Sequence, residues 1–143
     1  IIHRCLSPKN VFLDDVLFPK IGYFGLSSRF LSKDSLTHQS MAENRFTQIY
    51  TAPEVFQSNK YTKKGDAYSF ALIVYEILSN EKPFNEIKIN SDLMKESIIE
   101  NKRSLMTDNI PLCYRKLIKK FWSKEQDDRP TFEEIVSLSK MDD

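Results

Sequence analysis

The segment 66–79 constrains the fold most, because apolar side chains occur on every side of the helix that it predicts. Asp66 is predicted to be the N-cap residue of this helix, and Asn80 and Pro83 are predicted to end it. A helix that is apolar all round belongs inside a protein or a membrane, and this one is shorter than the roughly 18 residues that a membrane span needs. The sequence therefore predicts a buried helix at the centre of a larger helical body.

Shorter patterns predict the elements around this helix. The apolar runs at 11–13 and 19–24, separated by a turn-like pair of aspartates, predict a β-hairpin. Apolar residues at helical spacing predict three further helices, at 91–101, at 111–122 and from 131 onward, and a capping box opens the last one. One hairpin and four helices indicate a mostly α (α+β) fold. The predicted apolar face of the last helix consists of Phe132, Ile135, Val136 and Leu138.

Composition restricts the kinds of partner that we expect. The 143 residues are 41% hydrophobic and 29% charged, as in one soluble globular domain, and the formal net charge is +1. The basic residues are scattered among acidic ones, so no nucleic-acid partner is expected. No apolar stretch is long enough to span a membrane and no signal peptide is visible, so no membrane partner is expected either.

The two cysteines, Cys5 and Cys113, lie far apart in the sequence. This spacing predicts neither a zinc site nor a disulfide scaffold, so we expect no disulfide-linked partner and a reducing, cytoplasmic location. Cys113 is predicted to be a packed side chain of its helix. The chain begins with Ile1 rather than Met, and we expect it to be part of a longer sequence.

Three short motifs occur in the order and at the spacing of one known family. Residues 3–10 read H-R-C-L-S-P-K-N and resemble the protein-kinase catalytic loop H-R-D-L-x-x-x-N. The triplet Tyr23-Phe24-Gly25 stands where kinases have D-F-G, and 52–54 matches A-P-E. The chain therefore resembles the C-terminal lobe of a protein kinase. Within this partial domain, residues 1–143, the resemblance implies a catalytic loop at 3–10, an activation segment at 23–54 and C-lobe helices at 66–140.

Two further features refine this resemblance. The segment 127–132, D-D-R-P-T-F, and Trp122 are similar to the corresponding parts of tyrosine-kinase-like serine/threonine kinases. With only Gly22, Gly25 and Gly65, the chain has no room for a G-x-G-x-x-G nucleotide loop. The resemblance therefore implies that the nucleotide-binding N-lobe is absent from this chain.

The resemblance also implies that two groups needed for phosphoryl transfer are replaced. Cys5 stands at the position of the catalytic base, where a thiol does not offer the permanent negative charge of an aspartate. Tyr23 stands at the position of the chief magnesium ligand, and Mg²⁺ prefers carboxylate oxygens. Asn10, the other metal ligand, remains, and Ser7 replaces a usual lysine. The degenerate catalytic loop consists of His3, Arg4, Cys5, Ser7 and Asn10.

Other positions match the structural framework of the family. By resemblance, His3 and Phe24 belong to a hydrophobic spine, and Asp66 holds the backbone of the catalytic loop. Glu54 and Arg129 match a buried ion pair that ties the A-P-E segment to the last helices. If an N-lobe exists, the cofactor-binding positions would be Phe12 on the adenine floor, backed by Ile73 and Ile77, with Tyr23, Phe24 and Gly25.

The polar segment 25–51 shows little periodicity, and so long an irregular stretch is usually functional or mobile. It lies where kinases are commonly switched by phosphorylation. By resemblance, Arg4 would receive a phosphate there. The candidate phosphorylation sites are Ser32, Ser35, Thr37 and Thr47.

The sequence thus predicts a protein-kinase homologue without activity, a pseudokinase that binds or regulates an unidentified protein partner in phosphorylation signalling. Two alternatives stay open. The chain could belong to an ATP-binding serine/threonine kinase of weak activity whose N-lobe lies upstream, or it could be a truncated product without function. No cofactor is expected for this chain, and ATP and Mg²⁺ are expected only if an upstream N-lobe exists.

Overall fold

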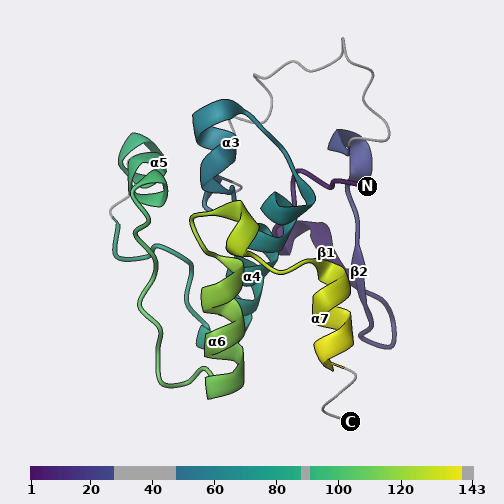
Figure 1. Ribbon diagram of the computed structural model, residues 1–143. Coiled ribbons are helices and arrows are strands. Elements are labelled where there is room, and N and C mark those ends of the chain that lie inside the picture. The colour runs from purple at the N-terminus through teal and green to yellow at the C-terminus, as the bar shows by residue number, and fades with distance from the viewer. Residues whose placement is uncertain (28–47, 88–90, 140–143) are drawn as a thin grey trace.

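A computed structural model describes residues 1–27, 48–87 and 91–139 of the chain. Helix α4 (Lys63–Ser79) lies beside α6 (Leu112–Phe121), with α3 (Pro53–Ser58) and α5 (Ser91–Ile99) toward one side and α7 (Phe132–Ser139) with a β-hairpin toward the other (Figure 1). The hairpin consists of β1 (Val11–Leu13) and β2 (Pro19–Ile21). The short 3-10 turns are η1 (Pro8–Asn10), η2 (Phe24–Leu26) and η3 (Gln126–Asp128). The predicted mostly α fold with one small antiparallel sheet is confirmed.

Helix α4 is the buried central helix that the sequence predicts. Tyr68 and Leu72 are fully buried in its middle, and the helix ends at Asn80, whose left-handed backbone lets its N–H donate to the carbonyl of Glu76. One apolar residue departs from the pattern, because the side chain of Ile77 is 71% exposed. Burial on all sides therefore holds for most of the helix but not for its last turn.

The prediction of Asp66 as the N-cap residue was wrong. The helix begins at Lys63, and Thr62 caps it, because the Thr62 hydroxyl accepts the backbone N–H of Gly65 at 3.0 Å. Asp66 lies one turn inside the helix, with its carboxylate facing the N-terminal segment of the chain. The sequence signal pointed to the wrong residue because Asp and Thr are both good caps and lie only one turn apart.

Helices α4 and α6 are joined by aromatic contacts. Phe70 contacts the ring of Phe121 at a centroid distance of 6.1 Å, and Tyr75 contacts Trp122 at 5.7 Å. Edge-to-face and tilted ring pairs of this kind add to the free energy gained by burial alone. The prediction that Cys113 is a packed side chain was wrong, because it lies on the exposed side of α6.

Helix α7 begins with the predicted capping box. The hydroxyl of Thr131 accepts the N–H of Glu134 at 3.2 Å, and the carboxylate of Glu134 accepts the N–H of Thr131 at 2.6 Å. Phe132 contacts the ring of Phe70 and so joins α7 to the centre of the fold. Val136 was wrongly assigned to the apolar face, since it is half exposed.

The hairpin pairs Val11 with Ile21 and Leu13 with Pro19. Bonds from Gly22 N–H to the Asn10 carbonyl and from Asp14 N–H to the Phe18 carbonyl flank this register. Hydrogen-bonded and non-hydrogen-bonded residue pairs alternate along an antiparallel ladder, so Leu13 and Pro19 form a non-hydrogen-bonded pair. Pro19 needs no N–H there, and the proline does not weaken the pairing. The second strand ends at Ile21, three residues earlier than predicted.

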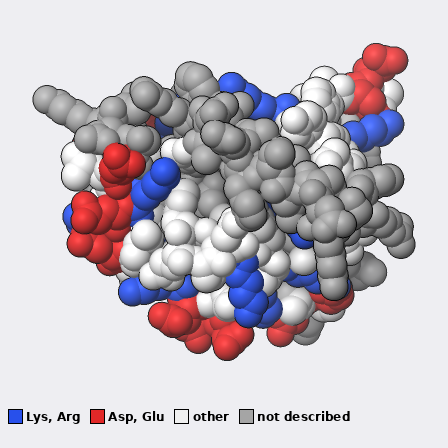
Figure 2. All heavy atoms as spheres, turned by 90° about the horizontal axis from the view of Figure 1, so that it is seen from above, with Lys and Arg blue, Asp and Glu red and all other residues white. Residues whose placement is uncertain are grey.

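Charges of both signs are interspersed on the surface. In the face that Figure 2 shows, the coloured Lys and Arg side chains lie near Asp and Glu side chains. Among the described residues, no helix is both long enough and apolar enough to cross a membrane.

Candidate functional site

The carboxylate of Asp66 holds the backbone at the start of the degenerate catalytic loop. The N–H of His3 donates to Asp66 Oδ2 at 2.7 Å, and the N–H of Arg4 donates to Oδ1 at 3.0 Å. Burial raises the pKa of Asp66, while these two hydrogen bonds act in the opposite direction. Arg4 has a left-handed backbone with φ of 71°, which is unfavourable for a long side chain. The two bonds to Asp66 fix this conformation.

The ring of His3 joins the loop to the segment after β2. Its Nδ1 faces the N–H of Cys5 at 3.3 Å, so Nδ1 accepts, and Nε2 must then carry the proton that it donates to the carbonyl of Gly22 at 2.8 Å. The ring also contacts Phe24 edge-on at a centroid distance of 5.0 Å. His3 and Phe24, which the resemblance places in one spine, are therefore in direct contact.

Cys5, which the resemblance places at the position of the catalytic base, lies beside Asn10. The amide nitrogen of Asn10 donates to the carbonyl of Cys5 at 2.6 Å and lies 3.5 Å from its sulfur. Burial raises the pKa of the Cys5 thiol, and the hydrogen bond from Asn10 opposes that shift only partly. At neutral pH the thiol is therefore protonated, and it offers no negative charge to a substrate hydroxyl.

Ser7 lies in the same loop and is almost completely buried. Its hydroxyl has no hydrogen-bond partner among the described residues. The lysine that the resemblance expects here would carry a positive charge, and a hydroxyl does not replace that charge.

Tyr23, which the resemblance places at the position of the chief metal ligand, lies at a turn of the chain. Its backbone is left-handed, with φ of 63°, and its side chain is 61% exposed. The side chains available here as metal ligands are thus a protonated thiol, a neutral amide and a phenol. None of them is the carboxylate that Mg²⁺ prefers. No cluster of three metal-ligating side chains occurs in the described part of the chain. These residues do not fit a magnesium site.

The positions assigned to an adenine floor do not share one environment. Ile73 is buried, whereas Phe12 and Ile77 are exposed. The ring of Phe12 lies over Gly22 so closely that a Cβ there would come within 2.7 Å of it. Any side chain at position 22 would therefore require the exposed ring of Phe12 to move. Gly25 has no such neighbour, since a Cβ added to it would meet nothing within 4 Å.

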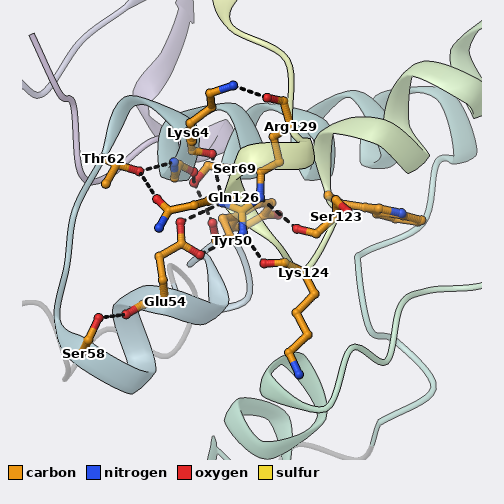
Figure 3. A network of polar contacts seen from close by, with 12 residues as sticks. Tyr50, Glu54, Ser58, Thr62, Lys64, Ser69, Ser123, Lys124, Gln126 and Arg129 are labelled. Atoms are coloured by element: carbon orange, nitrogen blue, oxygen red, sulfur yellow. Dashed lines mark hydrogen bonds and ion pairs between the residues drawn. The ribbon is translucent and has the colours of Figure 1, made fainter.

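Glu54 and Arg129 form a buried, bidentate ion pair with distances of 2.7 and 2.8 Å (Figure 3). A guanidinium has five N–H donors. Three of those on Arg129 go to backbone carbonyls, at 2.8 Å to Ser123, 3.0 Å to Lys64 and 2.9 Å to Lys124. Together with the two bonds to Glu54, these contacts use all five donors. The pair thus joins α3, the first turn of α4 and the segment before α7.

Sequence reasoning missed the aromatic partner of this ion pair. The ring of Tyr68 lies beneath the guanidinium of Arg129 at 5.1 Å and that of Arg103 at 5.3 Å. Burial raises the pKa of Tyr68 to about 12, so the ring stays neutral between the two cations. A fully buried tyrosine on a predicted central helix suggested packing only, and its role as a cation platform has no sequence signature.

Arg4 lies partly buried beside Tyr61, with its guanidinium 5.4 Å from the centre of that ring. Its Nε and Nη1 are buried and have no hydrogen-bond partner among the described residues. Two buried nitrogens of a cation therefore have N–H groups that are open to an acceptor. The four candidate phosphorylation sites lie outside the described residues.

A second polar network that the sequence did not suggest lies just before the A-P-E triplet. The hydroxyl of Tyr50 donates to Glu76, and Lys82 contacts the other carboxylate oxygen of Glu76 at 3.0 Å. Burial is the main reason that the pKa of Tyr50 is raised far above its usual value, and Glu76 adds to the shift. Ser69 donates to the carbonyl of Tyr50 at 2.7 Å. The backbone before α3 is thereby anchored to α4.

Comparison with known proteins identifies the family. The sequence matches the family described as protein tyrosine and serine/threonine kinase over residues 1–138. It is 32% identical over 139 residues to a putative serine/threonine-protein kinase/receptor of Acanthamoeba polyphaga mimivirus, covering 95% of this chain and 8% of that protein. The chain belongs to the protein kinase superfamily.

Two cellular relatives give the same result. A dual specificity protein kinase of Dictyostelium discoideum is 32% identical over 136 residues, which cover 95% of this chain and 26% of that protein. Mitogen-activated protein kinase kinase kinase 7 of Homo sapiens is 33% identical over 141 residues, which cover 96% of this chain and 22% of that protein. The chain thus spans about a quarter or less of the length of the curated relatives named here.

Proposed function

We propose that this kinase-domain protein is a pseudokinase that acts by binding and regulating a protein partner, without transferring phosphate. One contrast carries the proposal. Asp66 holds the backbone of the catalytic loop through two short hydrogen bonds, yet the base position within that loop is the protonated thiol of Cys5. Asp66 thus holds the backbone of a loop that has no carboxylate at the base position.

The second missing group adds to this argument. Phosphoryl transfer relies on charge neutralisation by metal ions, and Tyr23 offers them an exposed phenol in place of a carboxylate. Asn10 donates its amide N–H to the carbonyl of Cys5, so its side-chain oxygen is left as a single neutral ligand for a doubly charged ion. Losing general-base assistance alone lowers a rate by about 10²–10⁴-fold.

The framework gives such a protein a definite shape to present to a partner. The buried pair of Glu54 and Arg129 and the contact of His3 with Phe24 join segments that are far apart in the sequence. We propose that the partner is a protein, that neither nucleotide nor metal is needed to maintain this shape, and that the location is cytoplasmic. A phosphate on the segment before Gln48 would find two open donors on Arg4.

Phosphate transfer by the full-length protein tests the proposal. Purified protein is incubated with magnesium, radiolabelled ATP and a general protein substrate, beside the Asn10→Ala variant and the double variant C5D/Y23D. We expect no transfer above the protein-free blank for the native sequence. Gain of transfer in the double variant would show that the assay detects activity in this domain. Magnesium-dependent transfer by the native protein that Asn10→Ala abolishes would instead support a weakly active serine/threonine kinase.

A further inference from the structure

The turn that joins β1 to β2 exposes three large apolar side chains in succession. We define the hairpin tip as Val16, Leu17 and Phe18, whose exposed fractions are 82, 74 and 64%. Hairpin turns usually contain Gly, Asn, Asp or Ser, because these residues suit both the backbone and the solvent. A run of valine, leucine and phenylalanine at the end of a hairpin therefore needs an explanation.

The tip is held in one conformation by Asp14. Its Oδ1 accepts the N–H groups of Val16 at 3.1 Å and of Phe18 at 2.8 Å, and its carbonyl accepts the N–H of Leu17 at 2.9 Å. Its Oδ2 pairs with Lys20 at 3.1 Å. All three backbone donors of the tip are thus bonded to one residue. These backbone bonds hold the segment that exposes the three apolar side chains.

The backbone of Leu17 makes the sequence choice more unusual. Its φ is 62°, in the left-handed region where glycine or asparagine is favoured and a bulky side chain is disfavoured. The tip thus combines exposed apolar surface with an unfavourable backbone at the same residue. The left-handed backbone at Leu17 is the conformation that closes a three-residue hairpin loop, but an apolar side chain at that residue does not help to close it.

The charges beside the tip indicate what it meets. Asp14 and Asp15 immediately precede it, and Asp15 is exposed and has no ion pair among the described residues. Hydrogen bonds from Phe18 and Lys20 lower the pKa of Asp14, so this carboxylate stays ionised at neutral pH. Lys20 balances the charge of Asp14, so the carboxylate of Asp15 is the one that opposes insertion into an anionic membrane and that would repel its counterpart if two tips met. A cationic protein surface has neither disadvantage.

We propose that the hairpin tip docks into an apolar pocket on another protein, and that lysine or arginine side chains line the rim of that pocket. A tip fixed before binding loses little conformational entropy on docking, so a small contact can be specific. The aromatic side chain of Phe18 is the expected anchor, because buried aromatic residues dominate small interfaces. Asp15 would contact the basic rim and contribute mainly to the rate of association.

This inference names the surface through which the proposed binding module meets its partner, and it rests on that proposal. It does not depend on the catalytic loop, which lies at the opposite end of β1. A test of docking and a test of phosphate transfer can therefore fail separately. An active kinase whose tip binds a protein would overturn the proposed function alone.

Photo-crosslinking in the full-length protein tests the docking. The photoreactive residue p-benzoylphenylalanine replaces Leu17 in one sample and Leu105 in another, because the two leucines have matched exposures of 74 and 73%. After irradiation in the cells that make the protein, adducts are identified by mass spectrometry. We expect one protein that forms adducts with the Leu17 sample and not with the Leu105 sample.

The identified protein is then purified and its dissociation constant is measured. Phe18→Ser is expected to weaken binding at least tenfold. Asp15→Lys is expected to weaken it and to reduce its dependence on salt, while Leu105→Ser leaves it unchanged. Leu17→Gly is expected to raise Tm by relieving the left-handed backbone and yet to weaken binding, which separates docking from folding.

Several results would overturn the proposal. Adducts of the Leu17 sample that consist only of lipid, or only of a second copy of the chain, would assign the tip to a membrane or to self-association. The same adducts from both samples, or no protein adduct, would mean that the tip has no specific protein partner. Unchanged dissociation constants for Phe18→Ser and Asp15→Lys would have the same meaning.

Discussion

At the scale of single residues, the backbone of the predicted catalytic loop is held by hydrogen bonds, while the proposed loss of chemistry rests on two side chains, Cys5 and Tyr23. Arg4 and Tyr23 both have left-handed backbones, on either side of the hairpin, and bonds to Asp66 and Gly22 hold the segments that contain them. Burial raises the pKa of Cys5, which follows Arg4 in the loop, so its thiol carries no charge at neutral pH. A side chain that was exposed and ionised here could still act as a nucleophile, so the state of this thiol decides between a reactive and an inert residue.

Alkylation of the two cysteines measures that state. Burial raises the pKa of Cys5 above its usual value of about 9, so its thiolate fraction is lowered at every pH below that value. Cys113 is exposed and provides an internal control. At pH 7.5 we expect iodoacetamide to modify Cys113 at least about tenfold faster than Cys5, as followed by mass spectrometry of peptides. The rate at Cys5 should rise about tenfold per pH unit and should still be rising at pH 9, because its pKa lies above that value. Equal rates at pH 7.5 would indicate a reactive thiol instead.

At the scale of elements, Arg129 determines how three segments meet. The sequence predicted its pairing with Glu54 through family resemblance. The three carbonyl acceptors could not be predicted, because every residue has a carbonyl and only the folded backbone selects which ones point inward. The same limit explains the wrong cap of α4. Thr62 and Asp66 are equivalent in a local pattern, and only the tertiary contact of Asp66 with His3 and Arg4 distinguishes them.

Replacing Glu54 by glutamine tests the energetic role of the ion pair. The change preserves shape but leaves the guanidinium of Arg129, with a fully buried side chain, as an unpaired charge. We expect the free energy of unfolding to fall by about 3–5 kcal/mol, measured by urea denaturation. The matched control is Glu100→Gln, because Glu100 pairs with Lys102 and both side chains are more than half exposed. The control should change stability by less than about 1 kcal/mol. Similar small losses in both variants would contradict the assigned role of the buried pair.

At the scale of the whole molecule, the pattern of apolar residues predicted the central helix well and the surface poorly. Periodicity identified α4, because a helix buried on nearly all sides has few alternatives. It failed at Ile77, Val136 and Cys113, since an apolar side chain on a surface looks the same in sequence as one in the core. The hairpin shows the same limit. Its strands were recognised from their residue types, but nothing local indicated that both of its faces are exposed.

That exposure predicts how the 143-residue chain behaves in isolation. Leu13 and Ile21 lie on one face of the hairpin and Phe12 on the other, and all three are more than half exposed. A two-stranded hairpin is marginal without a covering layer, and contiguous apolar surface binds hydrophobic dyes. We expect the chain to enhance the fluorescence of anilinonaphthalene sulfonate under native conditions. The double variant Leu13→Thr/Ile21→Thr should reduce this signal by about half or more without lowering Tm, because threonine favours strands and neither side chain contributes to the core. Leu105→Thr, at an exposed leucine outside the hairpin, should leave the signal nearly unchanged. If the native chain bound no dye, or if both variants reduced the signal equally, the hairpin would not be the exposed apolar surface of this molecule.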